Sequence, residues 1–143
     1  MNDPYWIRRN RLAGSSFPHD RFQVERINNL QVRHIINLTS TDYRNKRWFP
    51  NSELHKLRIE DFSTPTKDVI SQFFTIAERA LERKEAVLVH CMAGCGRTGT
   101  MLALWLIKFE NLSADVAIET VRKVRPCALE TEDQIAFVKN FRV

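Results

Sequence analysis

Cysteine is scarce in this sequence, and its scarcity excludes a disulfide framework. The 143 residues include three cysteines, Cys91, Cys95 and Cys127, which is an odd number. A chain of this length buries roughly two thirds of the surface that it exposes when unfolded, so its core needs neither disulfides nor metal. We therefore expect the cysteines to be free for chemistry, in a reducing compartment such as the cytoplasm or also the nucleus.

Long apolar runs are also missing. The longest one, from Met101 to Ile107, is much shorter than the ~20 residues that span a bilayer. The first ten residues, MNDPYWIRRN, do not resemble the apolar core of a signal peptide. These absences predict a soluble protein that has no membrane partner.

Several motifs of other enzyme classes are absent. The sequence contains no GK[ST], which excludes a nucleotide triphosphatase of the Walker type. The four histidines, at positions 19, 34, 55 and 90, and the three cysteines show no paired ligand spacing, and Cys91-x3-Cys95 is not the CxxC of a dithiol oxidoreductase. We expect neither a metal nor a cofactor.

Acidic residues are fewer than basic residues, 17 against 22. The formal net charge is +5 and the pI is near 9.4, so the surface favours anionic partners such as phosphorylated protein, nucleic acid or acidic lipid. Charge alone does not choose among these three classes of partner.

Apolar periodicity predicts strands that alternate with helices. Short strands are expected around 6–7 and 12–14, and longer ones at 32–38, 54–59 and 86–90; helices are expected at 21–30, 66–83, 97–110, 113–125 and 131–141. Asp20 and Ser113 are the expected helix caps, and 39–52 is expected to be an exposed loop. This order predicts one α/β domain over residues 1–143, with a mainly parallel twisted sheet of four to five strands flanked by helices.

The sequence HCMAGCGRTG, at 90–99, joins the end of a predicted strand to the start of a helix. Free backbone N–H groups and the helix dipole make such a junction an anion site. The loop Met92-Ala93-Gly94-Cys95-Gly96 is long enough to surround one phosphate, and its glycines permit a close approach of the backbone. Arg97 can offer a planar fork to two phosphate oxygens.

The same positive field favours the thiolate of Cys91, which would be the nucleophile. The hydroxyl of Thr98 can donate a hydrogen bond to this sulfur and ease its expulsion later in the reaction. Cysteine and arginine at this spacing therefore indicate covalent phosphate chemistry.

These residues resemble the His-Cys-x5-Arg-Ser/Thr signature of the protein tyrosine phosphatase superfamily, and within it the chain is similar to the small atypical dual-specificity phosphatases. The likeness covers nearly the whole chain and includes the segments 10–14, 32–34, 57–62, 97–103 and 124–131. It implies a phosphocysteine intermediate and a phosphorylated protein as substrate, with phosphotyrosine and also phosphoserine or phosphothreonine as targets.

The resemblance also implies roles for residues outside the signature. It makes Asp61 the general acid, although Glu60 stands where the family usually has proline and could compete for that role. It makes His90 a support for the cysteine loop. Glu130 and Gln134 match a region that borders the active site in related enzymes, where they position the hydrolytic water or only cap a helix.

Other interpretations of the same residues stay open. Cys95 could form a reversible disulfide with Cys91, or it could be a small residue that the loop tolerates. The cradle could bind phosphate without turnover. The same chemistry could act on RNA 5′-triphosphate or a phosphoinositide through the basic residues Arg44, Lys46 and Arg47, with nucleic acid the less favoured partner. We expect a monomer.

Overall fold

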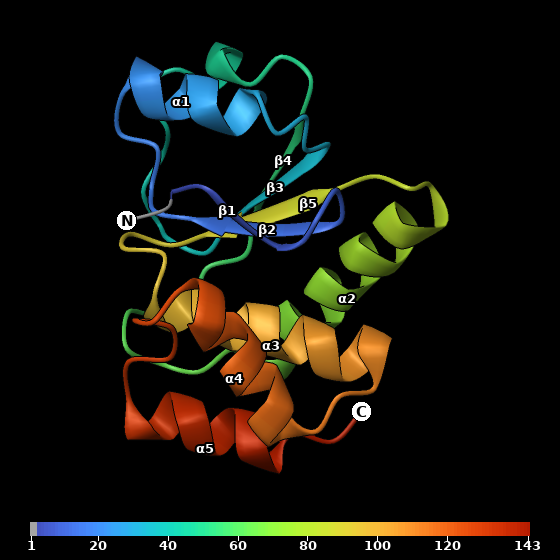
Figure 1. The fold of residues 1–143 in the computed structure, drawn as a ribbon. Helices are drawn as coiled ribbons and strands as arrows, with labels where there is room; N and C mark the ends of the chain where they lie inside the picture. Colours follow the sequence, from blue (N-terminus) through green and yellow to red (C-terminus); the bar gives the residue numbers. More distant parts are fainter. Residues whose placement is uncertain (1–2) are drawn as a thin grey trace.

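The computed structural model describes residues 3–143, and the first two residues of the predicted domain lie outside this range. Five strands form one sheet in the order β1-β2-β5-β3-β4 (Figure 1). The strands are β1 (Tyr5–Arg8), β2 (Leu12–Ser15), β3 (His34–Asn37), β4 (Glu53–Lys56) and β5 (Val87–His90). Only the β1–β2 pair is antiparallel, which confirms the predicted mainly parallel sheet.

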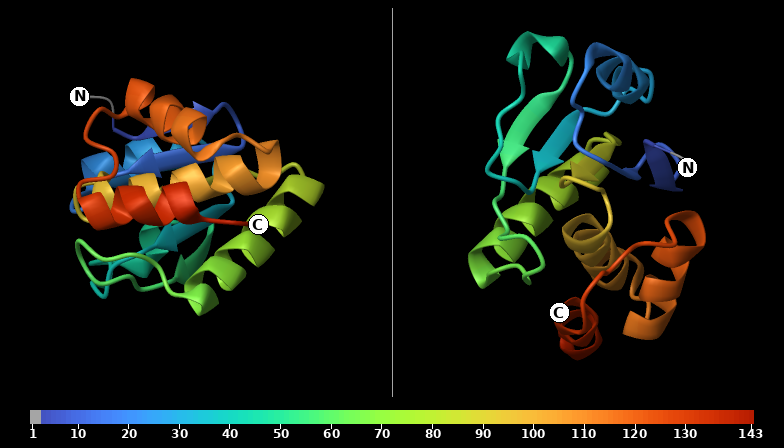
Figure 2. Two further views of the ribbon diagram at one scale, coloured as in Figure 1. Left: turned by 90° about the horizontal axis from the view of Figure 1, so that it is seen from below. Right: turned by 90° about the vertical axis from the view of Figure 1, so that its left-hand side faces the viewer.

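Helices cover both faces of the sheet (Figure 2). They are α1 (Arg21–Asn28), α2 (Lys67–Glu82), α3 (Gly96–Glu110), α4 (Ala114–Val124) and α5 (Glu132–Asn140), with a 3-10 turn, η1 (Lys46–Trp48), in the 39–52 loop. Figure 1 shows α1 and η1 on one side of the sheet and α2 to α5 on the other. This arrangement buries both sides of the central strands, as parallel sheets require.

Local sequence sets the helix ends. The side chains of Asp20 and Ser113 accept hydrogen bonds from backbone N–H groups in the first turns of α1 and α4, as predicted from their positions. Thr131 and Gln134 form a capping box at the start of α5. The α4 helix ends at Val124, two residues before Pro126, whose ring cannot continue a helix.

Alternation along each strand divides the core into two clusters. Val87, Val89 and Leu12 pack toward α2–α5, whereas Leu88 and Ile35 pack toward α1. Helix α3 is buried over most of its length because it lies between the sheet and the helices α4 and α5. The first turn of α3 is therefore buried, and it contains Arg97 and Thr98 of the signature.

Two sequence-based expectations differ from the structure. The near-helical spacing of Phe22, Ile27 and Leu30 predicts that they form the apolar stripe of α1; Ile27 is buried accordingly, but Phe22 is 68% exposed and Val24 faces the core beside Ile27. The fourth strand was expected at 54–59 but spans Glu53–Lys56, although the N–H groups of Leu57 and Ile59 still donate to Asn37 O and Leu38 O, both at 2.9 Å. Among residues 3–143, no helix is both long and apolar enough to cross a membrane.

Candidate active site

The loop between β5 and α3 is shaped by its glycines. Gly94 has a φ of +71°, and a Cβ atom there would lie 2.6 Å from the carbonyl group of Ser15. A Cβ on Gly96 would lie 2.7 Å from Glu130 Oε1. No other residue fits either position without displacing its neighbours, so the tight curl of the loop depends on glycine.

The outer side of the loop is tied down through its carbonyl groups. Tyr5 donates its hydroxyl to Gly94 O at 2.9 Å, and Arg125 Nη2 donates to Ala93 O at 2.7 Å. The Phe17 N–H donates to Met92 O at 2.9 Å. Because these bonds occupy successive carbonyl oxygens, they fix the loop in a shape that suits an anion on its other side.

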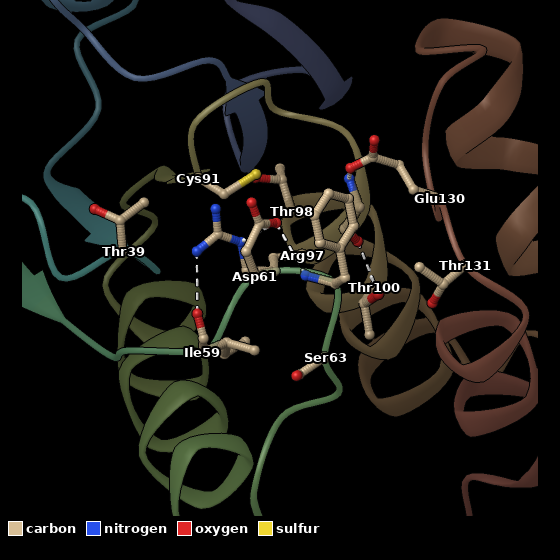
Figure 3. Close-up of polar contacts among 12 residues, drawn as sticks. Thr39, Ile59, Asp61, Ser63, Cys91, Arg97, Thr98, Thr100, Glu130 and Thr131 are labelled. Carbon is tan, nitrogen blue, oxygen red and sulfur yellow. Dashed lines mark hydrogen bonds and ion pairs between the residues drawn. The ribbon is translucent and has the colours of Figure 1, made fainter.

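Cys91 lies at the base of the loop. Its side chain is buried, and its Sγ accepts a hydrogen bond from Thr98 Oγ1 at 3.0 Å (Figure 3). Thr98 is itself fully buried in the first turn of α3, so the donor is fixed in place. A hydrogen bond donated to the sulfur stabilises negative charge that develops on it.

Arg97 is buried beside Cys91 and spans the two loops of the site. Its Nη1 donates to Ile59 O at 3.0 Å, and its Nε lies 3.4 Å from Asp61 Oδ1 (Figure 3). Nε has no hydrogen-bond partner among residues 3–143, so the ion pair with Asp61 is electrostatic only. Donor capacity therefore remains on this guanidinium for an anion.

Asp61 comes from a turn after β4. The Ser63 N–H donates to Glu60 O at 3.0 Å, and Asp61 Oδ1 accepts from the Phe62 N–H at 2.9 Å. Phe62 has a φ of +64° and is 59% exposed, which is an unfavourable backbone for a bulky residue. The turn brings Asp61 to the signature arginine, whereas the neighbouring Glu60 is exposed and supplies only its carbonyl to the turn.

His90 supports the loop from below. Its ring is fully buried, with Nδ1 3.2 Å from Cys91 O and Nε2 2.7 Å from the Tyr43 hydroxyl. A carbonyl oxygen can only accept, so Nδ1 carries the proton and Nε2 accepts from Tyr43. Burial lowers the pKa of His90 to about 4, which keeps the ring neutral near pH 7. The ring therefore links Tyr43 of the 39–52 loop to the backbone of the nucleophile.

Glu130 and Gln134 both lie at the loop. Glu130 Oε1 accepts from the Gly96 N–H at 3.1 Å, while Gln134 is fully buried and its Oε1 accepts from the Glu130 N–H at 2.8 Å. Gln134 Nε2 also lies 3.4 Å from Ser63 O in the acid turn. In this structure the side chain of Gln134 caps α5, the second of the two roles weighed for it from the sequence.

The prediction that all three cysteines are free thiols is wrong. Cys95 forms a disulfide with Cys127, with the two Cα atoms 5.2 Å apart, and Cys91 is a free thiol. The proposed Cys91–Cys95 bridge is thus absent, because the segment after α4 brings Cys127 to the loop from 32 residues away. The disulfide adds a covalent link to the hydrogen bonds that hold the loop.

Sequence reasoning missed the residues that hold the loop from outside it. Tyr5, Tyr43 and Arg125 are separated from their loop partners by between 32 and 89 residues. Tyr43 was assigned to an exposed loop, and Arg125 only to a segment shared with related enzymes. No periodicity marks such contacts; an aromatic residue in a short strand and an arginine beside proline were the only signals.

Comparisons with known proteins agree with this geometry. Residues 2–138 match the family described as "Swiss Army Knife protein, DSP-PTPase phosphatase domain". Human dual specificity protein phosphatase CDC14C is 33% identical over 138 residues, covering 87% of this chain and 30% of the relative. Mouse CDC14B is 32% identical over 135 residues, covering 85% and 27%. The chain thus spans less than a third of the length of these relatives.

Solved structures show the same fold. The crystal structure of Tk-PTP in the active form has a TM-score of 0.85 and 26% identity, covering 99% of this chain and 98% of that one. The structure of PTPMT1 in complex with PI(5)P has a TM-score of 0.82 and 22% identity, covering 96% and 93%. With the family match over residues 2–138 and the cysteine–arginine loop at the end of β5, the chain belongs to the DSP-PTPase phosphatase domain family.

Proposed function

We propose that this protein hydrolyses phosphate monoesters on phosphoproteins through a phosphocysteine intermediate. The observation that carries the proposal is the convergence on one loop of a Thr98-bonded Cys91 sulfur, the Arg97 guanidinium and the Asp61 carboxylate. Nucleophile, anion clamp and acid are the three groups that two-step phosphate transfer needs.

In the first step, the Cys91 thiolate attacks phosphorus in line with the leaving oxygen. The P–O bond breaks as Asp61, acting in its protonated form, transfers its proton to that oxygen, which leaves the alcohol or phenol, an S–P bond and an Asp61 carboxylate. Arg97 turns from Asp61 to the phosphoryl oxygens, and Asp61 is thereby released toward the leaving group. The loop amides and the start of α3 hold the remaining charge.

In the second step, water attacks phosphorus and the S–P bond breaks. Asp61, now ionised, takes the proton from water, and inorganic phosphate leaves with the sulfur again a thiolate. The hydrogen bond from Thr98, at 3.0 Å from Sγ, stabilises this developing negative charge. Gln134 supports the acid turn through Ser63 rather than the water in this mechanism.

We propose phosphotyrosine as the main target, with phosphoserine or phosphothreonine also accepted, and a monomer as the acting form. We also propose that the chain resembles dual specificity protein phosphatase 23, in the segments 10–14, 57–62 and 97–103 among others. The names of the CDC14 relatives support dual specificity as the substrate class.

A phosphoinositide is the second candidate substrate. The PTPMT1 neighbour was solved with PI(5)P, and here Arg44, Lys46 and Arg47 are exposed on the 39–52 loop, whose Tyr43 is bonded to His90 below the cysteine. A basic loop anchored beside the site would attract a multiply phosphorylated headgroup.

The first experiment measures hydrolysis of p-nitrophenyl phosphate and a phosphotyrosine peptide, with a chelator present, by wild type and Cys91→Ser. We expect at least about 10⁴-fold loss in the variant, because the covalent intermediate cannot form. Phosphoserine peptide, PI(5)P and RNA 5′-triphosphate under the same conditions rank the substrate classes.

Two outcomes would overturn the proposal. A wild type that binds phosphopeptide without turnover would indicate an interaction module. Activity retained by Cys91→Ser would exclude the cysteine as nucleophile. A rate on PI(5)P or RNA above that on every peptide would replace the substrate class and leave the chemistry intact.

A further inference from the structure

Two histidines and a glutamate gather at the end of the sheet that lies away from Cys91. His34 begins β3, and Glu53 and His55 lie on the neighbouring edge strand β4. Across this parallel pair, His34 is in register with Glu53, and Ile36 with His55. Residues two apart on a strand share a face, so all three side chains point to the same side.

The distances between their polar atoms suit coordination of one ion. His34 Nδ1 lies 3.2 Å from His55 Nε2 and 3.7 Å from Glu53 Oε2, and one ligand atom from each of the three residues lies within 4.8 Å of the others. Zn–N bonds of 2.0–2.1 Å in a tetrahedral site place two nitrogens about 3.3 Å apart. The histidine pair already has this separation.

A second carboxylate orients the buried histidine. His34 is buried, and its Nε2 lies 3.0 Å from Glu85 Oε1, on the segment that joins α2 to β5. A carboxylate oxygen accepts, so His34 donates this hydrogen bond from Nε2. The proton of a neutral ring is thus held on Nε2, and the Nδ1 lone pair faces His55 and Glu53. Carboxylate–histidine pairs of this kind support metal ligands in many proteins.

We infer that His34 Nδ1, His55 Nε2 and the Glu53 carboxylate bind one Zn²⁺ ion, with Glu85 as the orienting partner of His34. Two imidazoles and one carboxylate suit Zn²⁺ rather than Mg²⁺ or Ca²⁺, which prefer oxygen alone. Without metal, the His55 Nε2–H donates to His34 Nδ1; on binding, His55 moves its proton to Nδ1.

The site would stabilise the edge of the sheet rather than take part in turnover. In register, His34 is level with Val87, four residues before Cys91, so the ion would lie about 13 Å from the nucleophile along the strand. Strand β4 pairs with β3 alone and leads to the acid turn. A metal held by both strands would clamp this edge.

The test is titration of Zn²⁺ and Co²⁺ into untagged Cys91→Ser protein with its disulfide intact, so that no thiolate competes. We expect one equivalent to bind, with Co²⁺ giving visible absorption typical of a tetrahedral site and Zn²⁺ raising the thermal unfolding midpoint. His55→Ala should weaken binding at least about 100-fold, and Glu85→Gln about 10-fold. His19→Ala, at an exposed histidine outside the cluster, is the matched control.

Absence of binding by the parent, or equal binding by the parent and His55→Ala, would overturn the site. Glu53→Gln covers the case in which His55→Ala fails to fold, because Glu53 is largely exposed and its loss does not disturb packing. Phosphatase activity of the protein with Cys91 present should be the same with and without chelator. A dependence of the rate on Zn²⁺ would contradict the role assigned here, because it would place the ion in the reaction.

Discussion

The two loops that meet at Cys91 are held in different ways. The phosphate-binding loop, residues 91–96, is tied through its carbonyls to Tyr5, Phe17 and Arg125 and is cross-linked through Cys95. The acid turn, residues 60–63, is exposed, contains a positive φ at Phe62, and touches the signature through one ion pair of Asp61. The first loop is held in one shape by these contacts, whereas the proposed mechanism requires Asp61 to lose its ion pair with Arg97 when phosphate binds.

The acid turn gives the largest expected effect of a single change. Asp61→Asn should slow hydrolysis of a phosphotyrosine peptide by about 10³-fold, because the leaving oxygen then departs without a proton. Hydrolysis of p-nitrophenyl phosphate, whose leaving group needs less help, should slow much less. Rates for both substrates at saturating concentration measure the difference.

Glu60→Gln is the matched control, because it removes the neighbouring carboxylate and leaves the turn backbone in place. We expect it to keep both rates. If Glu60→Gln were the more damaging change, the acid would be Glu60 and the assignment of Asp61 would be wrong.

The phosphate-binding loop gives the next largest effect, on stability. The disulfide closes a span of 32 residues, and its loss should lower the free energy of unfolding by about 3 kcal/mol. Urea unfolding of wild type with and without dithiothreitol measures this loss. Cys127→Ala should show the lower stability in both conditions, and a further loss on reduction of this variant would contradict the explanation.

The buried histidine below the loop gives a smaller, pH-dependent effect. The pKa of His90 falls from its ordinary 6.5 to about 4 on folding, so between these pH values the unfolded chain binds a proton that the folded protein does not. Stability is full above pH 6.5 and is lost as pH falls toward 4. The share from His90 should be about 2 kcal/mol between pH 7 and pH 5.

Urea unfolding at pH 7 and pH 5 measures this share as the difference between wild type and His90→Gln, since carboxylates contribute equally to both. The wild type should lose more stability on acidification. An equal loss in the two proteins would mean that His90 is protonated in the folded state.

Much of this site could be predicted from the sequence because its signals are local. The signature joins a strand to a helix within ten residues, and the caps at Asp20 and Ser113 act within one turn. The mainly parallel sheet could also be predicted, because the alternating strand and helix patterns are local signals in the sequence. Asp61 was found only through resemblance to related enzymes, because a carboxylate in a turn has no distinguishing pattern of its own.

What could not be predicted depends on contacts between distant segments. The partner of Cys95 was sought nearby at Cys91, but the fold brings Cys127 to it. The histidines and Glu53 are brought together by strand pairing, and Glu53 lies just before the strand expected at 54–59, so the sequence did not place it on one face with His55. Phe22 is exposed because α1 covers one corner of the sheet and only part of its apolar stripe meets the core.

The anchoring of the 39–52 loop bears on how such an enzyme can diversify. Tyr43 is bonded to His90 at 2.7 Å and packs against the buried Phe49, with the two rings 5.2 Å apart. The residues between these anchors are mostly exposed, including the basic Arg44 and Arg47. Substitutions between Tyr43 and Phe49 can therefore change the charge of this segment, during evolution or in a designed library. They leave in place the Tyr43–His90 hydrogen bond that supports the cysteine loop.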